Sequence, residues 1–152
     1  MGGIKILKLI NKFLKKEEEQ SINGIEDVLK ELYNNKCKLF IASTKPTAFI
    51  EKLLIKYNLI QYFEYISGSP LKGECYLKEQ IIAEIITKYE LDKEETIMIG
   101  DRKFDIIGAK SNNIDSIGVI YGIGNLEEIN EEKSKHIAHI PKEILDIISE
   151  EQ

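Results

Sequence analysis

The stretch Gly100-Asp101-Arg102-Lys103-Phe104-Asp105-Ile106-Ile107-Gly108-Ala109 guides the interpretation of the whole sequence. It follows the run 96–99, which predicts a buried strand, and it opens a helix expected over 102–112. Asp101 and Asp105 stand four residues apart at this turn, so both carboxylates can reach one Mg²⁺, a hard cation that prefers oxygen ligands. A helix cap plus a first-turn acid favoured by the helix dipole explains the pair equally well.

Outward from this turn, short apolar runs alternate with amphipathic stretches, as is typical of a mostly parallel sheet flanked by helices. The expected strands are 37–42, 62–66, 96–99, 116–121 and a short one near 136–140. The expected helices are 24–35, 46–57, 76–89, 102–112 and one that starts at 141. Because no repeat or linker interrupts this alternation, we expect a single α/β domain over residues 1–152.

Further polar groups stand near the predicted ends of strands. Ser43 and Thr44 directly follow an expected strand, where hydroxyl and backbone N–H groups at a helix start can hold a phosphate. Lys78 lies near the start of a helix and can neutralise a phosphoryl oxygen. Open α/β sheets bind ligands at the carboxyl ends of their strands, so we expect these residues to share one pocket with Asp101 and Asp105. Taken singly, they fit a helix cap and a surface lysine.

This ordered set resembles the haloacid dehalogenase (HAD) superfamily, in its phosphoglycolate-phosphatase-like branch, from about residue 24 to 121. Ile41-Ala-Ser-Thr-Lys-Pro46 is similar to the second motif of the family, Lys78 to its third-motif lysine, and 100–109 to its fourth motif. The resemblance implies a three-layer Rossmann-like α/β domain and Mg²⁺-dependent hydrolysis of a small phosphorylated metabolite.

The same resemblance implies a role for each matching residue. Ser43 and Lys78 would be the catalytic residues on this chain, and together with Thr44 they would bind the phosphoryl group. Asp101 would ligate Mg²⁺, and Asp105 would support the ion directly or through water. Phosphoglycolate is the substrate that the branch suggests, and nothing in the sequence selects it.

One family motif has no counterpart in this sequence. Family members begin with an apolar strand that ends in Asp-x-Asp-Gly-Thr, whose first Asp is the nucleophile and whose second is the general acid and base. This sequence contains no Asp-x-Asp, and the usual cap insert is absent. We therefore expect a truncated or degenerate chain with negligible turnover alone. The alternatives are a non-catalytic binding or regulatory module and one half of a split phosphatase.

Residues 4–19 predict an amphipathic N-terminal helix. We favour a helix that packs its apolar side on the domain; the alternatives are an element that binds a partner or a membrane surface and a remnant of the last helix of the cap. Apolar residues recur on one helical face and lysines on the other. This interpretation leaves the central strand, between 37–42 and 96–99, missing from the sheet. Two repairs are then expected: direct closure of the sheet, which we favour, or a strand supplied by a second copy or a partner chain.

Composition narrows the classes of protein to which the chain can belong. A net charge of −5 disfavours nucleic-acid binding, because phosphate neutralisation needs clustered Lys and Arg. The sequence has no apolar tract of membrane-spanning length. Cys37 and Cys75 are isolated thiols without metal or disulfide spacing, which predicts a reducing, cytoplasmic location.

Overall fold

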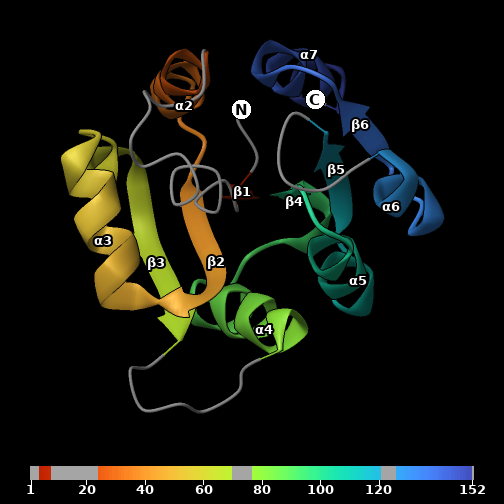
Figure 1. Cartoon of the computed structure of the whole chain (residues 1–152), viewed down its shortest axis with the longest axis horizontal. Helices are drawn as coiled ribbons and strands as arrows, with labels where there is room; N and C mark the ends of the chain where they lie inside the picture. The colour runs from red at the N-terminus through yellow and green to blue at the C-terminus, as the bar shows by residue number, and fades with distance from the viewer. Residues whose placement is uncertain (1–3, 8–23, 70–76, 121–125, 152) are drawn as a thin grey trace.

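The computed structural model describes residues 4–7, 24–69, 77–120 and 126–151. In these residues a parallel sheet of six strands has the order β3-β2-β1-β4-β5-β6 (Figure 1). The strands are β1 Ile4–Leu7, β2 Leu39–Pro46, β3 Phe63–Ser69, β4 Thr96–Gly100, β5 Asp115–Val119 and β6 His136–Ala138. The helices are α2 Ile25–Asn34, α3 Thr47–Lys56, α4 Lys78–Lys88, α5 Lys103–Ser111, α6 Leu126–Glu131 and α7 Pro141–Glu151.

Helices cover both faces of the sheet, so the domain has three layers as expected (Figure 1). An apolar core lies on each face of the sheet, and β2 contributes to both, because successive side chains of a strand point to opposite faces. Leu39 and Ile41 pack with apolar residues of α2, α3 and α7. Phe40 and Ala42 pack with those of α4 and α5. None of the described helices is both long and apolar enough to cross a bilayer.

Strand β1 shows that the expectation of a missing central strand was wrong. It lies between β2 and β4, with Ile6 opposite Phe40 on one side and Met98 on the other. The helix expected over 4–19 is therefore wrong for Ile4–Leu7, and its remainder falls outside the described residues. The gap is filled from within the chain, so neither direct closure nor a strand from another copy or chain is needed.

The end of β2 also differs from the expectation. The strand was expected to stop at residue 42 and continues to Pro46, which pairs with Ser69 of β3 after an irregularity in the register. The Gly68 N–H donates to Thr47 Oγ1 over 3.0 Å, which joins β3 to the first residue of α3. Ser43 therefore lies within a strand and not at a helix start, so the expected phosphate cradle at a helix N-terminus is not formed there.

Candidate functional site

Four of the predicted site residues lie where strands end and helices begin. Ser43 is in the last half of β2, Lys78 is the first residue of α4, Asp101 directly follows β4, and Asp105 is in the first turn of α5. Their exposed fractions are 0%, 5%, 2% and 0% in that order. Burial of four polar or charged side chains is costly unless each is compensated, so their contacts decide what the site can do.

Lys78 connects two sides of this site. Its Nζ donates to the carbonyl oxygen of Ala42 over 2.9 Å and lies 3.1 Å from Asp105 Oδ1. The contact with Ala42 brings the ammonium group beside the backbone of Ser43, and the contact with Asp105 compensates its charge. Lys78 is therefore a buried linking residue, and the alternative of an ordinary surface lysine was wrong.

The turn between β4 and α5 is built around Asp105. Its Oδ2 accepts the backbone N–H of Arg102 over 3.2 Å, which satisfies one of the N–H groups left unpaired at a helix start. A Cβ on Gly100 would overlap the side chain of Asp105, so the close approach of this carboxylate to the strand end requires glycine. Asp101 is buried in the same turn.

The β2 side of the site is more open. Ser43 Oγ accepts the backbone N–H of Lys45 over 3.1 Å. Thr44 and Lys45 are exposed. This side thus offers one buried hydroxyl, one exposed hydroxyl and two ammonium groups, counting Lys78, which are groups suited to an anion.

Glu128 is a residue of this region that sequence reasoning did not identify. Its Oε1 accepts the backbone N–H of Lys103 over 2.7 Å and the Nε–H of Arg102 over 3.1 Å. The hydrogen bond from Lys103 is the main reason why the pKa of Glu128 lies below its usual value, with Arg102 acting in the same direction and partial burial opposing both. In the sequence, Glu128 lies in an acidic segment in which nothing distinguishes it from Glu127.

The donor set fits a hard cation only in part. Both oxygens of Asp105 already have partners, Lys78 and the N–H of Arg102, so Asp105 suits a supporting role through water better than direct ligation. Asp101 is then the better direct ligand. Within the described ranges, no cluster of three or more His, Cys, Asp or Glu could hold a metal. The residues present thus fit a Mg²⁺ site with few protein ligands.

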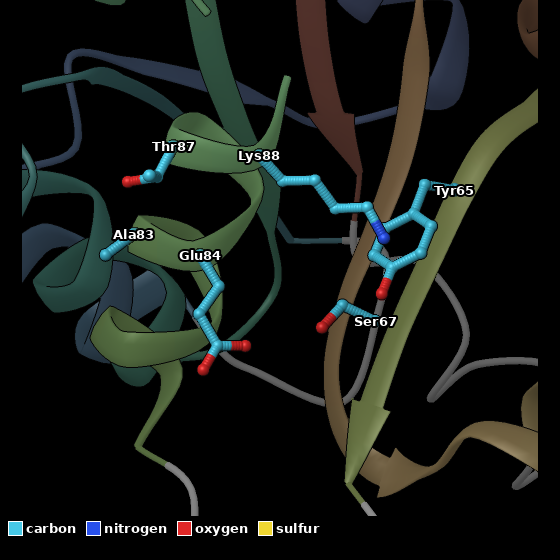
Figure 2. Close-up of a pocket in the computed structure, with 6 residues that line it drawn as sticks. All are labelled: Tyr65, Ser67, Ala83, Glu84, Thr87 and Lys88. Carbon is cyan, nitrogen blue, oxygen red and sulfur yellow. The ribbon is translucent and has the colours of Figure 1, made fainter. Parts of the chain in front are cut away.

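A separate groove of about 450 Å³ lies between the edge strand β3 and helix α4 (Figure 2). Its lining residues are Tyr65, Ser67, Ala83, Glu84, Thr87 and Lys88. Lys88 Nζ lies 4.0 Å from the centre of the Tyr65 ring, a cation–π contact. None of the predicted site residues lines this groove, so it is distinct from the site at the ends of β2 and β4.

The fold agrees with the comparison to known families. Residues 4–119 match the haloacid dehalogenase-like hydrolase family, and the chain belongs to that family. The resemblance inferred from the motifs is thereby confirmed.

Among curated relatives, a 5'-nucleotidase from Pseudomonas aeruginosa is 32% identical over 119 residues, which cover 78% of this chain and 54% of that protein. A phosphoglycolate phosphatase from Vibrio parahaemolyticus is 24% identical over 125 residues, which cover 82% of this chain and 55% of that protein. The chain thus spans about half the length of these relatives. Among solved structures, a protein from Clostridium difficile assigned as a phosphatase is 39% identical with a TM-score of 0.83, covering 90% of this chain and 65% of that one.

Proposed function

We propose that this chain binds Mg²⁺ and a small phosphate monoester in a HAD-type site, and that it does not hydrolyse the ester by itself. One observation carries the proposal. The sequence that follows β1 reads Lys8-Leu9-Ile10-Asn11, without a carboxylate, whereas Ser43, Lys78, Asp101 and Asp105 are all present and buried. The binding groups are thus retained without the carboxylates that the family resemblance assigns to nucleophile and acid/base.

The two sides of the site suit two different ligands. Asp101, supported by Asp105, would hold Mg²⁺, which when bound supplies positive charge to a phosphoryl oxygen. Ser43, Thr44 and Lys78 would contact the phosphoryl group from the β2 and α4 side, with hydrogen bonds strengthened by its charge. The names of the relatives favour a small phosphorylated metabolite such as phosphoglycolate or a nucleotide.

Turnover needs an activated nucleophile, and the described contacts provide none. In the described part of the chain, the Ser43 hydroxyl hydrogen-bonds to the N–H of Lys45, which cannot act as a base. Covalent catalysis requires a neighbouring base or a lowered pKa to activate a hydroxyl. Ser43 is therefore a binding residue in this proposal.

The proposal is tested with p-nitrophenyl phosphate and Mg²⁺, using the wild type, Asp101→Ala and the exposed control Asp146→Ala. We expect no turnover from any of the three. Titration calorimetry with Mg²⁺ and inorganic phosphate should show binding that Asp101→Ala weakens and Asp146→Ala does not. Hydrolysis abolished by Asp101→Ala would overturn the proposed lack of activity. Hydrolysis that appears only with cell lysate would favour half of a split phosphatase.

The alternative of a binding or regulatory module loses part of its basis. It relied on a basic N-terminal helix and on exposed strand edges on both sides of an empty central position, and β1 occupies that position. A cytoplasmic location remains part of the proposal, supported by the burial of Cys37, as expected for a structural cysteine in a reducing compartment.

A further inference from the structure

Glu128 reaches the metal side of the site from another element. It lies on α6, 25 residues beyond Lys103, yet its Oε1 accepts both the Lys103 N–H and the Arg102 Nε–H. The Glu128 side chain is 20% exposed and that of Arg102 is 35% exposed, so this ion pair is only partly open to solvent. A single carboxylate oxygen thus joins α6 to the start of α5.

The contacts of Arg102 show what this connection holds in place. Its backbone N–H donates to Asp105 Oδ2, and its side chain donates to Glu128. Asp105 therefore fixes the main chain of Arg102, and Glu128 fixes the side chain of Arg102. The N–H groups of Arg102 and Lys103, at the start of α5, are thus occupied by the carboxylates of Asp105 and Glu128.

The position of α6 is itself well defined, as the connection requires. Ile129, next to Glu128, is fully buried. A Cβ on Gly118 of β5 would overlap Ile129, so this strand lets α6 approach it closely through a glycine. A carboxylate on such a packed element can fix the turn more firmly than a side chain on a loose loop.

We propose that Glu128 is a positioning residue for the metal side of the site, acting through Arg102 and Lys103 without touching the ligand. This inference rests on the proposed function, because it concerns the Mg²⁺ affinity of Asp101 and Asp105. Removal of a residue that orients the metal ligands without binding the metal itself typically lowers the metal affinity by roughly 10–100-fold.

The decisive variant is Glu128→Asp, which keeps the negative charge and shortens the side chain by one methylene. Its Mg²⁺ affinity, measured by calorimetry, should be roughly tenfold weaker than that of the wild type. The amide of Lys103 should exchange its hydrogen roughly tenfold faster, because its charged acceptor is withdrawn. Glu127→Asp and Glu127→Gln, on the same helix, should match the wild type in both measurements.

Glu128→Gln separates positioning from charge. This variant keeps an acceptor for the Lys103 N–H and loses the ion pair with Arg102. The hydrogen-exchange rate of the Lys103 amide should therefore lie between the rates in the wild type and in Glu128→Asp. If Glu128→Asp behaved as the wild type while Glu128→Gln lost Mg²⁺ affinity, Glu128 would act by charge alone and the inference would be overturned. Unchanged exchange at Lys103 in Glu128→Asp would also overturn it, whether or not Mg²⁺ binds. Absence of Mg²⁺ binding by the wild type would instead overturn the proposed function.

Discussion

The α5 side and the β2 side of the candidate site are held in different ways. On the α5 side, Asp105 contacts Lys78 and the N–H of Arg102, and Glu128 holds the same turn from outside. On the β2 side, Ser43 is held by a local hydrogen bond from Lys45, and Thr44 is exposed. Buried carboxylates must be compensated before any ligand binds. The acidic side is therefore preorganised, whereas on the β2 side Ser43 is buried and Thr44 and Lys45 are exposed to solvent.

Lys78 belongs to both sides, so its replacement should have the largest effect on stability. Lys78→Met leaves the fully buried carboxylate of Asp105 without its cation. Breaking a buried pair in this way costs about 3–5 kcal/mol. Urea unfolding of Lys78→Met should show a loss of that size.

Two further variants show whether that loss comes from the ion pair. Lys78→Met combined with Asp105→Asn removes both charges and should recover most of the loss. Lys88→Met makes the same change at an exposed position on the same helix, over the Tyr65 ring, and should cost less than about 1 kcal/mol. A double variant no more stable than Lys78→Met alone would show that the two sides are not joined by this pair.

The close packing of the α5 side gives the second prediction. Gly100→Ala places a methyl group on the side chain of Asp105 and should destabilise the domain by about 3 kcal/mol, the upper part of the usual range for overpacking. Gly108→Ala is the matched control. Its Cβ would lie 3.0 Å from Ile82 Cδ1, 3.1 Å from Lys78 Cγ and 3.3 Å from the backbone N of Glu79, whereas a Cβ on Gly100 would lie 2.3 Å from Asp105 Cβ.

The helical propensity of alanine partly offsets this crowding, so Gly108→Ala should change the free energy of unfolding by less than about 1 kcal/mol. Thermal and urea unfolding of both variants would check this ranking. Equal losses from Gly100→Ala and Gly108→Ala would contradict the view that the turn around Asp105 is the tightly constrained side.

Sequence reasoning placed most of the helices and strands, because their patterns are long enough to show a period. The turn 100–105 was located from its glycine and its two aspartates, and the structure pairs Asp105 with Lys78. Strand β1 was missed because Ile-Lys-Ile-Leu is four residues long and continues into a stretch with helical spacing. A period cannot be measured over so short a run.

Glu128 was missed for a different reason. Its role depends on α6 packing beside α5, which no local pattern encodes, and the segment around it offers several equivalent glutamates. The continuation of β2 through Ser43 depends likewise on pairing with β3, a contact between distant residues. Local chemistry therefore predicted the groups at the site, whereas their support came from tertiary contacts.

Ser43→Ala tests the more open β2 side. Loss of the local hydrogen bond from Lys45 should cost about 1 kcal/mol of stability, well below the effect of Gly100→Ala. Binding of inorganic phosphate in the presence of Mg²⁺ should weaken by about tenfold, because a hydrogen bond to a charged group is lost. Ser67→Ala, in the groove beside α4, should leave phosphate binding unchanged. Phosphate affinity that survives Ser43→Ala would place the anion elsewhere.

The smallest effect concerns the pH dependence of the α5 side. The N–H of Lys103 lowers the pKa of Glu128 below its usual value of 4.5, so the ionised form is favoured by folding. Stability from this group is therefore fully present above pH 4.5 and is lost as the pH falls through the lowered pKa. Between pH 7 and about pH 3, the wild type should lose more stability than Glu128→Gln, by less than about 1 kcal/mol, as for partly exposed ion pairs. Urea unfolding across this range should show Glu127→Gln following the wild type. Parallel pH profiles for the wild type and Glu128→Gln would mean that the hydrogen bonds from Arg102 and Lys103 to Glu128 do not stabilise the start of α5 in solution.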